Sequence, residues 1–149
     1  MSRRKVLWIS VGVALVAGIT FIPLRSLDCP AWDVWVVNQN GRPVSGATVR
    51  LTYQNYSAEL RSHEVDAITD AHGHVKFSAQ MLSASLAQRI RAVLSSAAAG
   101  VHASFGLHAD VFAFGNGLEG FDIRQNVVVD WTGKPNHMES RIVLAPRKL

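Results

Sequence analysis

The sequence of 149 residues is long enough for one folded domain with attached segments. Most of its formal net charge of +4 comes from the N-terminal region, where Arg3, Arg4 and Lys5 precede an apolar segment and Arg25 follows it. Residues 31–149 hold the other 11 Lys or Arg residues and ten of the 11 Asp or Glu residues. No basic stripe is left there, which excludes a nucleic-acid partner, and the single cysteine excludes an internal disulfide bond.

Residues 6–22 are 17 uncharged and mostly apolar positions in a row, closed by Pro23. As a helix this run would span about 26 Å at 1.5 Å per residue, the short end of what crosses a bilayer. The basic residues before it favour a cytoplasmic N-terminus and export of the chain that follows. We therefore expect residues 1–24 to be a signal-anchor helix, with residues 6–22 in the lipid bilayer, or else a signal peptide.

The two interpretations differ in where they leave the rest of the chain. A retained anchor holds the C-terminal domain at the membrane, on the periplasmic or extracellular side, whereas a cleaved signal peptide leaves it secreted. Small residues near Ala17 and Gly18 are the available cleavage region. The apolar run continues past them and no good A-x-A site stands there, which favours the anchor.

After a predicted linker at residues 25–31, the hydrophobic period changes to two, as in strands. The phrase "NGRPVSGATVRL", residues 40–51, combines a tight reversal with the start of a half-buried strand. The phrase "TDAHGHVKF", residues 69–77, contains a second reversal, in which Asp70 starts the turn and Gly73 supplies a left-handed residue. Both phrases indicate corners of a β-sandwich.

Together these phrases resemble the carboxypeptidase regulatory-like domain, and the closing "SRIVLAP", residues 140–146, resembles the last strand of that family. The resemblance implies a mainly β fold for residues 32–149, a transthyretin-like antiparallel β-sandwich of about seven strands. It also implies an accessory or binding module with no catalytic residues and no cofactor.

Helical spacing interrupts the strand pattern at about residues 79–99. One stripe of this segment is apolar and ends before Gly100, a plausible helix stop; its members are Leu82, Leu86, Ile90, Val93 and Ala97. We expect an inserted α-helix whose stripe packs on an edge or end of the sandwich, with a partner contact as the alternative. Phe112 and Phe114 fall on the outer face of a later strand, which predicts that the helix or a second subunit covers them.

His72 and His74 are the candidate metal ligands of the sequence. They form an H-x-H pair, a spacing that can chelate Zn²⁺ or Cu²⁺ when both side chains share a strand face. Gly73 between them belongs to a turn, however, so exposed turn histidines are the favoured interpretation.

A metal-dependent enzyme on a sandwich of this kind is the least favoured of the functional alternatives. Intradiol dioxygenases bind iron with two tyrosines followed by an H-x-H, and this chain has Tyr53, Tyr56, His72 and His74 in that order. The two tyrosines are only three positions apart and the Arg-Pro lead-in of that family is missing. The C-terminal Tyr-Arg-Gly-Ser of the transthyretin-like hydrolases is also missing.

Trp35 and Trp131 are the candidate partner surface, because exposed indoles stack on sugars and contact proteins. The sequence therefore predicts a membrane-tethered or exported module that binds a partner outside the cytoplasm without catalysis. A protein or a glycan is the expected partner, and a carbohydrate-binding module is the first alternative.

Overall fold

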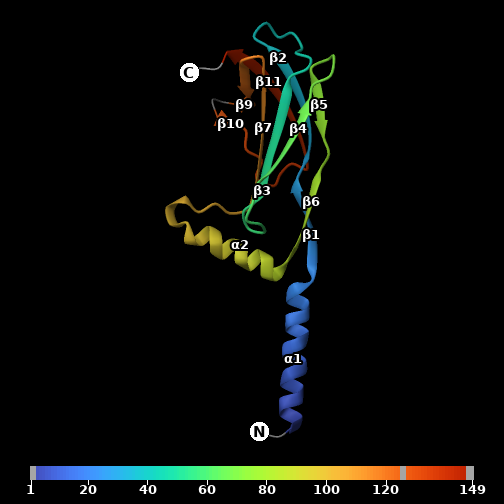
Figure 1. The fold of residues 1–149 in the computed structure, drawn as a ribbon, viewed down its shortest axis with the longest axis vertical. Coiled ribbons are helices and arrows are strands. Elements are labelled where there is room, and N and C mark those ends of the chain that lie inside the picture. The colour runs from blue at the N-terminus through green and yellow to red at the C-terminus, as the bar shows by residue number, and fades with distance from the viewer. Residues whose placement is uncertain (1–2, 125–126, 147–149) are drawn as a thin grey trace.

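The computed structural model describes residues 3–124 and 127–146 (Figure 1). It confirms the predicted fold class, a mainly β, sandwich-like domain that follows an apolar N-terminal helix. The elements in chain order are α1 (Arg3–Phe21), β1 (Pro23–Cys29), β2 (Ala31–Asn38), β3 (Thr48–Asn55), β4 (His63–Ile68), β5 (His74–Phe77), β6 (Gln80–Ser85), α2 (Leu86–Ala98), the 3₁₀ turn η1 (Gly100–His102), β7 (Leu107–Gly115), β8 (Leu118–Phe121), β9 (Ile123–Arg124), β10 (Val127–Val128) and β11 (His137–Pro146).

The main sheet has seven strands in the order β4-β3-β7-β8-β11-β2-β5. Its neighbours pair antiparallel except β11 and β2, which run parallel from the pair His137–Ala31 to the pair Leu144–Asn38. Beyond that point Ala145 and Pro146 pair with β8 instead. Because β11 thus passes from one half of the sheet to the other, the sheet folds over on itself and is nearly closed.

The alternating burial of β3 confirms the half-buried strand predicted from the phrase at residues 40–51. On β3, Val49, Leu51 and Tyr53 are buried and face the inward side chains of β2 and β7. The largest fully buried side chains are the indoles of Trp32 and Trp131. Burial of aromatic rings contributes most per residue to a core of this size.

The predicted turn at Asp70 and Gly73 is confirmed. The Asp70 carboxylate accepts hydrogen bonds from the backbone N–H groups of His72 and His74, at 2.8 and 2.9 Å. Gly73 has φ +70°, and a Cβ there would lie 2.5 Å from the Val36 carbonyl oxygen. A glycine is therefore required both by the left-handed backbone and by the close approach of β2.

The segment predicted as a linker, residues 25–31, is not one. Residues 23–29 form β1, which pairs antiparallel with β6 in a two-stranded ribbon between α1 and the sandwich (Figure 1). Asp28, Cys29 and Pro30 are buried where this ribbon enters the sandwich. The linker prediction was wrong because the pairing partner of β1 lies in a segment that we had assigned to the helix.

The inserted helix exists but is shorter than predicted. Ser85 caps α2 in a reciprocal arrangement with Gln88, so the helix begins at residue 86 and residues 80–85 remain a strand. Ala92 is the buried residue of α2, whereas Leu86, Ile90 and Val93 of the predicted stripe are exposed. The prediction that this stripe packs on the sandwich is therefore wrong.

Phe112 and Phe114 are half-buried by their own sheet face. Their rings stack on each other, Phe112 also stacks on Phe121, and the Arg50 guanidinium lies over both rings at 6.0 and 5.7 Å from the centroids. Arg50 is held in turn by Glu64 and Asp66 of β4. Side chains of the same sheet thus cover the two rings, in the place where we expected a helix or a second subunit.

Candidate functional site

Trp35 keeps the exposed position that the sequence predicted. Its side chain is 38% exposed on the outer face of β2, and its ring centroid lies 4.9 Å from that of His74 on β5. His74 Nε2 lies 2.8 Å from Asp33 Oδ1, and the other oxygen of Asp33 faces Lys76 and His137. The result is one aromatic ring within a charged, hydrogen-bonded surface.

The predicted metal pair of His72 and His74 is not arranged as a chelate. The His74 ring is turned towards Asp33 and Trp35 on β2, whereas His72 is an exposed residue of the turn. In the described part of the chain, the group of three or more potential metal ligands that lie close together contains neither residue. Sequence spacing placed the two histidines together, but the turn separates the directions of their side chains.

Trp131 is not a surface residue, and its prediction as a partner contact was wrong. It is 1% exposed, its indole N–H donates to the Pro135 carbonyl at 2.6 Å, and its backbone pairs with that of Ala109. The turn-like sequence around it suggested exposure, but the isolated bridge to β7 draws the ring into the core.

The tyrosines of the dioxygenase-like order also lie apart from the H-x-H. The Tyr53 ring stacks on His63, with centroids 5.0 Å apart and planes 19° apart. The Tyr56 ring meets His108 edge-on at 5.2 Å. Each tyrosine thus has a histidine neighbour other than His72 or His74.

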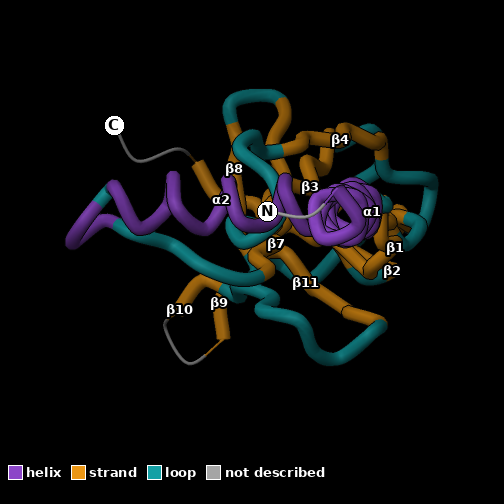
Figure 2. The backbone as a smooth tube through the Cα atoms, turned by 90° about the horizontal axis from the view of Figure 1, so that it is seen from below, coloured by secondary structure: helices purple, strands orange, loops and turns teal. Residues whose placement is uncertain are grey.

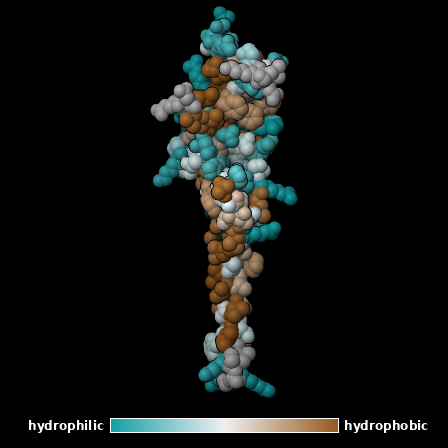
Figure 3. Space-filling model, turned by 90° about the vertical axis from the view of Figure 1, so that its left-hand side faces the viewer, coloured by the Kyte–Doolittle hydropathy of each residue, from teal (hydrophilic) through white to brown (hydrophobic). Residues whose placement is uncertain are grey.

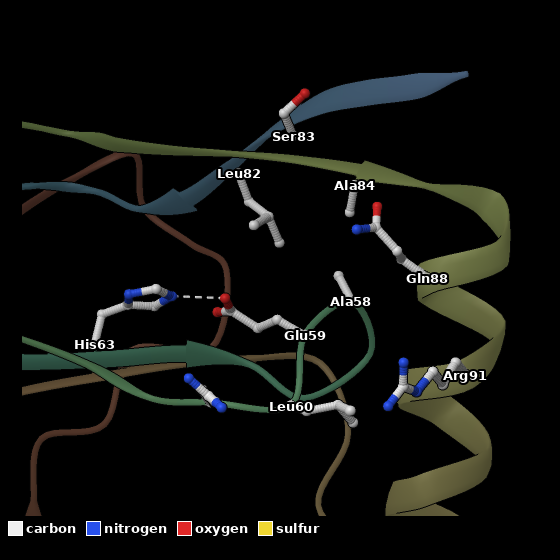
Figure 4. A pocket seen from close by; sticks show the side chains of 10 residues that line it. Ala58, Glu59, Leu60, His63, Leu82, Ser83, Ala84, Gln88 and Arg91 are labelled. Atoms are coloured by element: carbon white, nitrogen blue, oxygen red, sulfur yellow. Dashed lines mark hydrogen bonds and ion pairs between the residues drawn. The ribbon is translucent and has the colours of Figure 1, made fainter. Parts of the chain in front are cut away.

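A cavity of about 380 Å³ lies at the end of the sandwich nearest α1. Its walls come from the loop after β3, from β6 and from the start of α2 (Figure 4). Ala58, Leu82 and Ala84 give it an apolar side, and Glu59 and His63 point into it from the loop side, joined by a hydrogen bond (Figure 4). Concave sites that combine apolar walls with a few polar groups are typical of ligand pockets.

Asp28 lies behind this cavity wall and forms a cluster with Glu59 and His63. One ligand atom from each of the three residues lies within 4.8 Å of the other two. Asp28 is 2% exposed, and its Oδ1 has no hydrogen-bond partner among the described residues. Burial raises the pKa of Asp28 to about 6, and the negative charge of Glu59 adds to this effect, while His63 and Arg89 oppose it.

Two neighbouring groups complete the surroundings of the cluster. Burial, with the charge of Asp28 second, raises the pKa of the Cys29 thiol to about 12, so this thiol stays protonated. Burial also raises the pKa of Tyr53. Carboxylates and an imidazole are therefore the ligands that this site offers at neutral pH.

No local sequence pattern indicates this cluster. Asp28 lies in the segment predicted as a linker, Glu59 lies in the loop between β3 and β4, and His63 is the first residue of β4. Their approach depends on the pairing of β1 with β6 and on the position of the loop after β3, neither of which has a local sequence pattern. Asp28 precedes Cys29 and Pro30, but its burial, and with it a role as a ligand, can be inferred only once β1 is known to enter the core.

Comparison with known proteins adds little to this description. No family profile and no curated protein matches the sequence. Among solved structures, 3-chlorocatechol 1,2-dioxygenase from Rhodococcus opacus 1CP is similar with a TM-score of 0.48 and 17% sequence identity. The likeness covers 80% of this chain and 61% of that one, so the chain spans about three-fifths of the dioxygenase, and a likeness of this size bears on neither activity nor ligand.

Proposed function

We propose that the chain is a membrane-tethered, non-catalytic binding module whose sandwich acts outside the cytoplasm. The observation that carries this proposal is the exposure of α1. This 19-residue helix has a mean hydropathy of 1.6 over its most apolar window, none of which is buried within the protein. Figure 3 shows hydrophobic side chains along its length and hydrophilic ones at its lower tip. A bilayer is the environment that covers such a helix, and the basic tip favours a cytoplasmic N-terminus.

The connection between α1 and the sandwich supports a fixed placement of the domain close to the bilayer. One residue, Ile22, separates α1 from β1, and β1 is paired with β6 along most of its length. Arg89 of α2 adds a hydrogen bond to Ser26 of β1 at 2.9 Å. A paired ribbon is stiffer than a flexible linker, so the proposed anchor would hold the cavity end of the sandwich towards the membrane.

The outward face of α2 supports the same orientation. The face opposite buried Ala92 is apolar, with exposed Arg91 at one border; its members are Leu86, Ala87, Ile90, Val93, Leu94, Ala97 and Ala98. Figures 1 and 2 show α2 crossing the end of the sandwich from which α1 leaves, at a steep angle to α1. An apolar face beside a membrane anchor is the arrangement of a helix that lies in the lipid interface.

Location and attachment are tested with reporters fused to the C-terminus in intact cells. Alkaline phosphatase, which is active only after export, is expected to be active, and the fusion is expected to stay in membranes washed with alkaline carbonate. Activity in the soluble exported fraction would instead indicate a cleaved signal peptide. A fluorescent cytosolic fusion to green fluorescent protein would contradict the proposal.

The binding role is tested by photo-cross-linking from the surface of the sandwich in intact cells, followed by mass spectrometry. A carbohydrate partner is the second candidate, because Trp35 presents a partly exposed indole on the outer face of β2. A binding glycan is expected to shift the tryptophan fluorescence of the native chain and to lose that effect in the variant Trp35→Ala. An unchanged fluorescence spectrum across a panel of polysaccharides would exclude the glycan partner and retain the protein partner as the candidate.

A further inference from the structure

The carboxylate of Asp28 is buried and makes no ion pair within hydrogen-bonding distance in the described part of the chain. Its Oδ1 has no partner among the described residues, and the nearby Glu59 carboxylate adds a second potential negative charge. The positive charge of Arg89 acts to lower the pKa of Asp28. However, Arg89 Nη2 donates its hydrogen bonds to the Leu24 carbonyl and the Ser26 hydroxyl. Buried charges in proteins are paired or bind a metal, because an isolated charge is costly to remove from water.

From this arrangement we propose that Asp28, Glu59 and His63 bind a divalent transition-metal ion, for which Zn²⁺ is the first candidate. Two carboxylate oxygens and one imidazole nitrogen are ligands that Zn²⁺ accepts. The three ligand atoms lie within 4.8 Å of one another, whereas ligands of one zinc ion are roughly 3–3.5 Å apart. Glu59 and His63 are already joined by a 2.6 Å hydrogen bond, so the longer separations involve Asp28, and ion binding requires this bond to open and both groups to shift towards Asp28. His63 is half-exposed and has room for this shift.

The surroundings orient two of the ligands. Glu59 Oε1 accepts a hydrogen bond from the Asn55 backbone N–H at 3.0 Å, which leaves Oε2 directed at His63 Nε2, 2.6 Å away. Tyr53 supports the flat side of the His63 ring. Such second-layer contacts fix the direction of metal ligands and raise affinity.

The cavity supplies access to the proposed ion. Glu59 and His63 line it, while Asp28 is the buried third ligand behind them. Three protein ligands would leave at least one zinc position free for a small ligand that enters through the cavity. The metal proposal does not depend on membrane attachment, because all three ligands belong to the sandwich and its ribbon.

The test uses the full chain in nanodiscs, stripped of metal with EDTA and titrated with Zn²⁺ by calorimetry. We expect saturable binding of about one equivalent and a higher melting temperature in Zn²⁺. Co²⁺ in place of Zn²⁺ is expected to give a visible absorption band that reports an ordered site with nitrogen and oxygen ligands.

Variants decide which residues hold the ion. His63→Ala and Glu59→Gln are each expected to weaken Zn²⁺ binding by more than about tenfold. The matched control His72→Ala/His74→Ala, which removes the histidine pair predicted from the sequence, is expected to bind as the native chain does. Circular dichroism checks that each variant is folded, and Glu59→Gln, a nearly isosteric change, keeps the test valid if His63→Ala unfolds.

Three results would overturn the proposal. They are no saturable binding by the native chain, binding that survives in both His63→Ala and Glu59→Gln, and binding that only the His72→Ala/His74→Ala control loses. None of these results bears on the membrane location, which the reporter fusions test separately.

Discussion

The indole N–H of Trp32 donates a hydrogen bond to Ser140 Oγ at 2.7 Å, and both side chains are buried. This bond joins β2 to β11, the first and last strands of the main sheet in chain order. Ser140 in turn donates a hydrogen bond from its own hydroxyl to Asp122 Oδ2 at 2.5 Å. The chain of two bonds therefore fastens the parallel pair through its side chains as well as through its backbone.

Ser140→Ala is expected to lower the free energy of unfolding by roughly 1–3 kcal/mol, because it leaves the Trp32 N–H buried without a partner. Ser45→Ala is the control, since Ser45 is exposed and its change is expected to have almost no effect. Thermal unfolding of the full chain in detergent, followed by circular dichroism, measures both. Equal midpoints for the two variants would mean that the Trp32 bond adds nothing to stability.

Alanine substitutions at Gly73 and Gly46 distinguish two ways in which an added Cβ destabilises the fold, namely backbone strain at positive φ and steric overlap with a neighbouring strand. Both have positive φ, +70° and +76°, but a Cβ at Gly73 would meet the Val36 carbonyl oxygen, whereas a Cβ at Gly46 has open space within 4 Å. Gly46→Ala is expected to cost about 1 kcal/mol for its backbone conformation alone. Gly73→Ala is expected to cost clearly more, because β5 must also move away from β2.

The same thermal unfolding measures this pair of glycine variants. The difference between them isolates the contact with Val36, since the left-handed backbone is common to both. If Gly73→Ala is no more destabilised than Gly46→Ala, the turn moves freely enough to accept the methyl group.

The features that the sequence predicted correctly are those set by interactions between residues close together in the chain. The turn at Asp70 and Gly73 depends on one carboxylate and one left-handed glycine, and the inward side chains of β3 depend on alternation. These features follow from residues that are neighbours in the chain, so a single sequence contains them.

What the sequence did not predict depends on pairing between distant segments. β1 has no alternation of its own and becomes a strand because β6 lies beside it. Trp131 is buried because its backbone bridges to Ala109. The cluster of Asp28, Glu59 and His63 combines both effects, since it needs the ribbon and the loop after β3 in place together.

Asp28→Asn is expected to stabilise the metal-free protein at pH 7.5. The pKa of Asp28 is raised from 3.8 to about 6 in the folded chain, so the folded state holds this proton more tightly than the unfolded state does. The stabilising contribution is complete below about pH 4 and is lost as the pH rises through 6. At pH 7.5 the ionised carboxylate costs up to roughly 3 kcal/mol, a cost that the neutral amide avoids.

Thermal unfolding in EDTA from pH 4 to pH 7.5 tests this prediction. The difference in melting temperature between Asp28→Asn and the native chain is expected to grow in favour of the variant as the pH rises. Added Zn²⁺ is expected to reverse the order at pH 7.5, because only the native chain regains a counter-charge for Asp28. A variant that is less stable than the native chain at pH 7.5 in EDTA would show that Asp28 has a favourable partner in the folded state.

The outward face of α2 is expected to lie in lipid when the full chain is in nanodiscs. Leu94 is 65% exposed on this face, whereas Ser95, also exposed, comes three positions after buried Ala92 and so lies on the Ala92 side of the helix. Leu94→Cys and Ser95→Cys, each labelled with a polarity-sensitive fluorophore, form a matched pair. The native Cys29 does not compete for label, because it is buried and its raised pKa keeps it protonated.

The label at position 94 is expected to emit at shorter wavelength and to be quenched by quenchers attached to lipid tails. The label at position 95 is expected to respond less. Equal, water-like emission from both labels, in protein that stays bound to the nanodisc, would place α2 away from the bilayer without contradicting the proposed anchor α1.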